Sequence, residues 1–129
     1  QITIIDYLQE GIYMIKFYRN EETKAIVVAL QGEVCPGLKE LVANTTDAAQ
    51  EKHVPAVTRE NGKVHVQIGS VEHPMLEEHH IEWIALESEG RLVFKYLKPG
   101  DKPVADFCDA ASGTVYEYCN LHGLWKAEF

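Results

Sequence analysis

Residues 81–86 read Ile-Glu-Trp-Ile-Ala-Leu, a dense apolar run that predicts a β-strand buried on much of both faces. Glu89 and Gly90 follow this run and indicate a turn. Four other short apolar runs are bounded by turn residues: 64–68, 92–97, 104–107 and 114–119. Short strands at this spacing predict an all-β chain that folds as an antiparallel β-sandwich of about seven strands.

One stretch departs from the strand pattern. Asp47 is followed three residues later by Gln50, a variant of the capping box that predicts a single helical turn with Asp47 as its N-cap. Pro55 restricts the residue before it to extended conformations. We therefore expect the helical turn to end before His53.

Composition and charge narrow the class of protein. The chain has 129 residues, the usual size of one domain, and a formal net charge of -8, which disfavours nucleic acid and anionic membranes as partners. The apolar residues 1–17 are interrupted by Asp6 and Glu10 without a basic leader, so we expect neither a signal peptide nor a membrane span. Three cysteines are an odd number, which favours a reducing compartment, by default the cytoplasm.

The histidines are placed unevenly, and most of them lie in predicted loops or at strand ends. His53, His73, His79 and His122 occupy such positions, where a rigid sandwich can direct side chains to one place. Cys119 and His122 form Cys-x-x-His, a spacing that lets both side chains reach one metal ion. Each motif alone is weak, but their joint occurrence predicts a metal site.

The other histidines and cysteines are better explained without a metal. His65 alternates outward from a predicted strand, and His80 points opposite to His79 on an extended chain. Cys108 reads as a bystander thiol near a strand end, and Cys35 has no partner at ligand spacing. We therefore leave these residues out of the predicted site.

Four separated motifs carry a resemblance to a known family. They are Glu-Lys-His-Val-Pro at 51–55, Gly-Ser-Val-Glu-His-Pro-Met at 69–75, His-His-Ile-Glu-Trp-Ile at 79–84 and Tyr-Cys-Asn-Leu-His-Gly-Leu-Trp at 118–125. In this order they resemble the superoxide reductases, the neelaredoxin and desulfoferrodoxin proteins of anaerobes and microaerophiles. The resemblance covers roughly residues 38–129.

The resemblance implies an immunoglobulin-like sandwich that holds one mononuclear iron, cycling between Fe²⁺ and Fe³⁺, and that reduces superoxide to hydrogen peroxide. It implies four equatorial imidazoles and one axial thiolate as ligands: His53, His73, His79, His122 and Cys119. Glu51 matches a carboxylate that can occupy the sixth position in the oxidised state. Lys52, beside a ligand, matches the lysine that attracts superoxide.

The N-terminal part resembles a module that has lost its metal. Residues 14–19, Met-Ile-Lys-Phe-Tyr-Arg, look like the start of a desulfoferrodoxin, whose next residues open an iron site with four cysteines. Here Asn20 and Thr23 stand at the Cys-x-x-Cys positions, and Cys35 remains near the later pair. The predicted division is a 1–13 extension, a 14–38 degenerate desulforedoxin-like module without metal, and a 39–129 iron-binding domain.

The ligand set also suggests how the site is tuned and supplied with electrons. A thiolate pushes electron density onto its metal, and we expect the backbone N–H groups of Asn120 and Leu121 to donate to the Cys119 sulfur. Without the N-terminal iron, the electron must come from an external donor, which the resemblance suggests is rubredoxin or a similar small redox protein. Exposed sheet edges predict a homodimer or homotetramer.

Two alternatives remain open at this level. A non-catalytic metal could stabilise an immunoglobulin-like binding module, but five ligands are one too many for a closed tetrahedral zinc site. A pure electron-transfer protein is the other alternative, against which the expected open sixth position argues.

Overall fold

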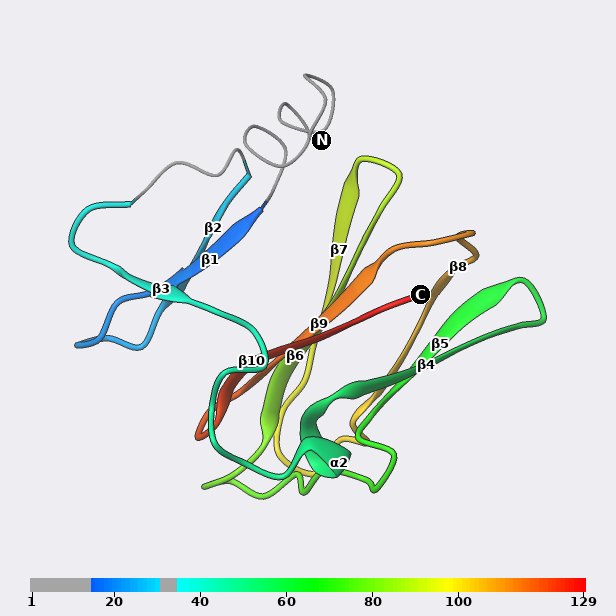
Figure 1. The fold of residues 1–129 in the computed structure, drawn as a ribbon. Coiled ribbons are helices and arrows are strands. Elements are labelled where there is room, and N and C mark those ends of the chain that lie inside the picture. The colour runs from blue at the N-terminus through cyan, green and yellow to red at the C-terminus, as the bar shows by residue number, and fades with distance from the viewer. Residues whose placement is uncertain (1–14, 31–34) are drawn as a thin grey trace. The chain divides into compact units, whose positions relative to one another are not determined.

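The computed structural model describes residues 15–30 and 35–129 and divides the chain into two compact units, Gln1–Val42 and Ala43–Phe129 (Figure 1). The predicted 1–13 extension lies outside the described residues, as do Met14 and residues 31–34. Within the described ranges, no helix has the length and apolar character that crossing a bilayer would require.

The first unit contains a small antiparallel sheet with strand order β2-β1-β3. Its strands are β1 (Lys16–Arg19), β2 (Ile26–Ala29) and β3 (Lys39–Leu41). Phe17 and Tyr18 of the central strand are buried. β3 lies beyond residue 38, where the sequence-based division placed the end of the module, and the compact unit itself ends at Val42.

Hydrogen bonds close the turn between β1 and β2. The Asn20 Oδ1 atom accepts from the backbone N–H groups of Glu22 (2.9 Å) and Thr23 (3.1 Å). The Thr23 hydroxyl in turn accepts from the backbone N–H of Ala25 at 3.3 Å. Asn and Thr side chains commonly close turns in this way. The two residues that stand at the Cys-x-x-Cys positions therefore hold the turn through local hydrogen bonds.

The second unit is an antiparallel sandwich of seven strands, as predicted. One sheet has the order β10-β9-β6-β7 and the other the order β4-β5-β8. The strands are β4 (Pro55–Glu60), β5 (Lys63–Ile68), β6 (Ile81–Ser88), β7 (Arg91–Tyr96), β8 (Val104–Cys108), β9 (Thr114–Cys119) and β10 (Gly123–Glu128). The five apolar runs correspond to β5 through β9, which confirms them as strands.

The core lies between the two sheets. Val64, Val66 and Ile68 of β5 form one apolar cluster with Ile84 and Leu86 of β6. The 81–86 run is buried at every position except Glu82, which is half-buried, so the expectation for this strand is confirmed. Burial of these aliphatic side chains stabilises the two sheets against each other and gives their strand ends fixed positions.

The helical turn α2 (Gln50–His53) forms, but its predicted bounds were wrong at both ends. Asp47 lies in a bend, and Ala49 occupies the N-cap position without a side-chain cap hydrogen bond. The turn includes His53 instead of ending before it. Val54, which precedes Pro55, is the first extended residue (φ -68°, ψ 125°), so the restriction imposed by proline acts one residue later than expected.

Gly69 allows β5 to pass closely against α2. Its φ is +81°, and a β-carbon placed there would overlap the Val71 carbonyl oxygen and lie 2.8 Å from the Glu51 carbonyl oxygen. The Val71 N–H donates to the same Glu51 oxygen at 2.9 Å. Only glycine combines a left-handed backbone with this close approach, and the contact fixes α2, which carries His53, against the end of β5.

We predict that Gly69→Ala lowers the free energy of unfolding by roughly 3 kcal/mol, because backbone strain and steric overlap add. Gly62→Ala is the matched control. Gly62 has a similar φ of +72° but no atom within 4 Å of its added β-carbon, so strain alone should cost about 1–2 kcal/mol. Urea unfolding of both variants measures the difference, and equal losses would contradict the close approach.

Candidate metal centre

The five predicted ligands come from segments that meet at one end of the sandwich, where α2 also lies (Figure 1). His53 ends α2, His73 follows β5, and His79 precedes β6. Cys119 is the last residue of β9, and His122 lies in the turn to β10. β9 ends where β6 and β10 begin, and its antiparallel pairing with both strands brings segments far apart in sequence together.

The four imidazole rings form a square. Neighbouring ring centroids are 4.7 Å apart for His53 and His73, 4.6 Å for His73 and His79, 5.0 Å for His79 and His122, and 4.9 Å for His122 and His53. Adjacent rings are nearly perpendicular, with interplanar angles of 73° to 87°. His53 and His79 lie across the square, with centroids 6.3 Å apart.

Ring nitrogens and the cysteine sulfur converge within this square. His53 Nε2 lies 3.2 Å from His73 Nε2 and 3.1 Å from His122 Nδ1. The Cys119 Sγ atom lies 3.6 Å from His73 Nε2 and 4.0 Å from His122 Nδ1. One donor atom from each of His53, His73, His79 and Cys119 falls within 4.8 Å of all the others. Five potential donors thus surround one small volume.

Carbonyl groups orient two of these rings, and an indole packs beside them. The Nδ1 atoms of His53 and His73 lie 2.7 Å and 2.6 Å from the carbonyl oxygens of Ala49 and Pro74, which directs the Nε2 atoms inward. Trp125 stacks on His53, with centroids 4.9 Å apart, and its Nε1–H donates to the His122 carbonyl oxygen at 3.0 Å. These contacts hold the rings before any metal binds.

Burial keeps three of the four imidazoles uncharged. It lowers the pKa of His73 to about 4, and it also lowers the pKa values of His53 and His79. Charges on neighbouring histidines lower the pKa of each of the three rings further. At neutral pH these rings are neutral, the form in which imidazole binds a metal.

The Cys119 side chain is fully buried, and burial raises the pKa of its thiol to about 11. Backbone N–H groups of His122 and Leu121 oppose this rise by hydrogen bonding to the sulfur. The expectation for Leu121 therefore holds, but the expectation for Asn120 was wrong. The Asn120 N–H donates to the His80 carbonyl oxygen at 3.2 Å, which extends the contact between β9 and the β6 segment by one residue past Cys119.

These residues fit a single transition-metal ion. Adjacent nitrogen ligands of a first-row metal lie about 3 Å apart, since each bond is about 2.1 Å long, and the His53 Nε2 distances of 3.2 Å and 3.1 Å match this spacing. The His79 Nε2 atom is buried without a hydrogen-bond partner among the described residues, as a ligand awaiting a metal would be. Imidazoles with one thiolate suit iron, and five donors exceed a tetrahedral zinc site.

Glu51 and Lys52 lie in α2, immediately before His53, and both are exposed. The positive charge of Lys52 is among the influences that lower the pKa values of His53 and His79, after burial, so it acts on both rings. The negative charge of Glu51 raises the pKa of His53. The Glu51 carboxylate makes no hydrogen bond to any residue in the described ranges.

The sequence reasoning missed Glu117. This residue lies two positions before Cys119 on β9, on the same face of the strand, and is fully buried. Both of its carboxylate oxygens are buried without a hydrogen-bond partner among the described residues, and burial raises its pKa well above the usual value. Its charge would raise the pKa of the Cys119 thiol. A charged residue inside the apolar β9 run was the available signal.

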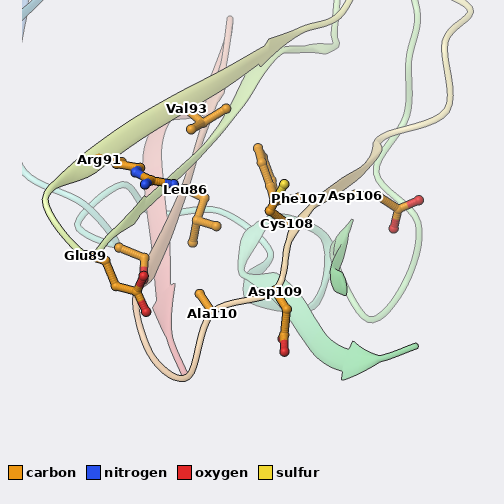
Figure 2. Close-up of a pocket in the computed structure, with 10 residues that line it drawn as sticks. Leu86, Glu89, Arg91, Val93, Asp106, Phe107, Cys108, Asp109 and Ala110 are labelled. Carbon is orange, nitrogen blue, oxygen red and sulfur yellow. The ribbon is translucent and has the colours of Figure 1, made fainter. Parts of the chain in front are cut away.

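Three of the residues left out of the predicted site have other surroundings in their own units. His65 faces Asp106 on the neighbouring strand, with Nδ1 2.7 Å from the carboxylate oxygen, and Cys35 and Cys108 are free thiols. Cys108 lines a pocket of about 260 Å³ between β7 and β8 (Figure 2). Ser88, also in its lining, is seven residues along β6 from Ile81, or about 23 Å at the rise of a strand. The pocket is therefore distant from the histidine square.

Comparisons with known proteins agree with this geometry. The family model described as Desulfoferrodoxin matches residues 45–128. The chain belongs to the desulfoferrodoxin family. The desulfoferrodoxin of Clostridium acetobutylicum is 49% identical over 120 residues, which cover 88% of this chain and 96% of that protein.

Other family members carry the name superoxide reductase. That of Pyrococcus horikoshii is 37% identical over 111 residues, covering 70% of this chain and 96% of its own length. The crystal structure of the superoxide reductase from Treponema pallidum superposes with a TM-score of 0.74 at 31% identity, covering 88% of this chain and 98% of that one. The resemblance drawn from the four motifs is confirmed.

We predict that the metal-free protein loses stability as the pH falls from about 6.5 toward 4. His73 takes up a proton near 6.5 when unfolded but only near 4 when folded, so acid favours the unfolded state by on the order of 2–3 kcal/mol. Urea unfolding across this range measures the loss. His73→Gln should remove much of it and His65→Gln, on an exposed histidine, should not. A flat profile would contradict the burial of neutral rings.

Proposed function

We propose that this chain is a superoxide reductase, which adds one electron and two protons to superoxide to give hydrogen peroxide. The observation that carries the proposal is the square of four imidazoles, two of them buried, with the Cys119 sulfur beside it. Membership of a family whose members are named superoxide reductases supports it.

We assign the ligands as the sequence predicted them. His53, His73, His79 and His122 would hold a mononuclear iron through ring nitrogens, and Cys119 through its thiolate. Such an iron supplies a one-electron couple, Fe²⁺/Fe³⁺, and a positive centre for an anionic substrate. The raised pKa of the Cys119 thiol means that the protein releases a proton when the sulfur becomes a ligand.

Lys52 attracts the anionic substrate against the net charge of -8 carried by the chain. Its ammonium group is exposed and lies close enough to the square to influence two of its rings. A local positive charge raises the concentration of an anion at the site and so increases the association rate. For Glu51, which also precedes His53, we keep the role of a carboxylate that can approach the oxidised centre.

We place the protein in the cytoplasm, since its three cysteines are free thiols. Residues 14–38 serve as a degenerate desulforedoxin-like module, in which the Asn20 turn is closed by hydrogen bonds.

Electrons then come from an external donor, rubredoxin or a similar small redox protein. The exposed edge strand β7 favours a homodimer or homotetramer.

Mixing reduced, iron-loaded protein with a pulse of superoxide tests the function. A reductase should yield one hydrogen peroxide for each superoxide and no dioxygen, whereas dismutation would yield half as much peroxide and release dioxygen. In Cys119→Ser the thiolate-to-iron absorption of the oxidised form should disappear. Iron-loaded protein that leaves superoxide unconsumed would refute the proposal.

Lys52→Ala should slow the superoxide-dependent step about tenfold at low ionic strength, because steering by a local charge is lost. The difference from the unmodified protein should shrink as salt is added. Lys63→Ala is the matched control, since Lys63 is exposed on β5 and pairs with Cys108 at the far end of the sandwich. Iron content should be unchanged in both variants. An unchanged rate in Lys52→Ala would remove Lys52 from the mechanism.

A further inference from the structure

Asn120 lies between Cys119 and His122, and its side chain binds the segment that carries another proposed ligand. The Asn120 Oδ1 atom accepts from the backbone N–H of His80 at 2.9 Å. Its Nδ2 group donates to the backbone carbonyl oxygen of Glu78 at 3.0 Å. The Asn120 backbone N–H donates to the His80 carbonyl oxygen at 3.2 Å. These hydrogen bonds bracket His79 on both sides.

They occur where regular strand pairing ends. The β6–β9 register runs regularly as far as Trp83 and Tyr118, shifts between Ile81 and Trp83, and has its last pair at Ile81 and Cys119. Residues 78–80 therefore lie beyond the ladder. At this point the side-chain amide of Asn120 makes the hydrogen bonds that a neighbouring strand would otherwise make, because it offers one acceptor and one donor in a single plane.

The His79 ring has no comparable anchor of its own. The Nδ1 atoms of His53 and His73 each lie within hydrogen-bonding distance of a carbonyl oxygen. The His79 ring makes no hydrogen bond to any residue in 15–30 or 35–129, and its Nε2 atom is buried. Its direction therefore depends on the backbone of its loop, which is joined internally by the Leu76 N–H to His79 oxygen hydrogen bond at 2.9 Å.

We propose that Asn120 is a positioning residue: its side-chain amide fixes the His79 loop against the Cys119–His122 turn and so sets the geometry of the metal site. The proposal deepens the proposed function, because it takes His79, Cys119 and His122 as ligands of one metal. Asn120 itself touches neither metal nor substrate in this assignment. Partners of this kind hold ligands in place, and their loss typically weakens metal binding about 10- to 100-fold.

The two hydrogen bonds of the amide can be removed separately. Asn120→Asp keeps the acceptor for the His80 N–H but places a carboxylate oxygen against the Glu78 carbonyl oxygen. Asn120→Ala removes both. Disruption should therefore increase from asparagine to aspartate to alanine, an order that general loss of stability does not require.

Asn44 offers a matched control at the β10 edge of the same sheet. Its Nδ2 group donates to the Lys126 carbonyl oxygen at 3.2 Å, and its Oδ1 atom accepts from the Lys126 N–H at 2.8 Å. Asn44→Ala thus removes the same pair of hydrogen bonds, and the positive φ of 63° adds strain to the variant. This variant should be at least as destabilised as Asn120→Ala, while the segments that carry the proposed metal ligands stay intact.

Cobalt(II) titration against a competing chelator, with visible spectra, tests the proposal on the metal-free full chain. We expect Asn120→Ala to bind cobalt about 10- to 100-fold more weakly and to show a shifted thiolate-to-cobalt absorption, with Asn120→Asp between it and the unmodified protein. Asn44→Ala should keep the affinity and spectrum of the unmodified protein despite a lower unfolding midpoint. If Asn120→Ala does not fold, Asn120→Asp carries the comparison.

Amide hydrogen exchange in the metal-free protein supplies a reading that does not depend on metal. The His80 amide should be protected in the unmodified chain and exchange faster in Asn120→Ala. An unmodified chain that binds no cobalt would refute the proposed function, whereas protection of His80 would still support the Asn120 contact. Asn120→Ala with unchanged cobalt affinity and spectrum would overturn the positioning role, as would an unprotected His80 amide in the unmodified chain.

Discussion

Four imidazoles and a thiol must be held together at one end of the sandwich, and the structure around them follows from this constraint. Buried polar groups are costly unless they have partners. The inward Nε2 atoms of His53 and His73 point at other donors, and His79 Nε2 has no partner among the described residues. The stability of this end of the fold is therefore tied to what the donors bind.

The sandwich supplies rigid positions for the donors. Strand ends are fixed by a core that includes Ile68, Ile81 and Cys119 itself, so each adjoining ligand starts from a fixed backbone. Gly69 brings α2 against the end of β5, and Trp125 covers the His53 ring. The site is thus built from short extensions of the core rather than from long loops, which favours a preformed arrangement.

Charge is distributed on two scales. The chain as a whole is acidic, and Glu117, two residues before Cys119 on β9, is buried without a hydrogen-bond partner in the described part of the protein. Burial raises the pKa of the Cys119 thiol, and the charge that Glu117 would carry raises it further, so the neutral thiol is favoured when no cation is present. A bound cation would reverse this balance and favour the thiolate. Lys52 provides the exposed positive charge on the approach to the same place.

The sequence by itself determined the strand class, the family and the candidate ligands, because alternation, turn residues and ligand spacing are local properties. Strands β5 to β9 were predicted from apolar runs, whereas β4 and β10 were not, since Pro55–Glu60 and Gly123–Glu128 are mixed in polarity and take their strand form from pairing with neighbours. Only the tertiary structure decided that α2 includes His53, that the Asn120 N–H binds His80 rather than the sulfur, and that Glu117 is buried beside Cys119. Each of these depends on which segments lie side by side across the sheets, and no local pattern in the chain contains that information.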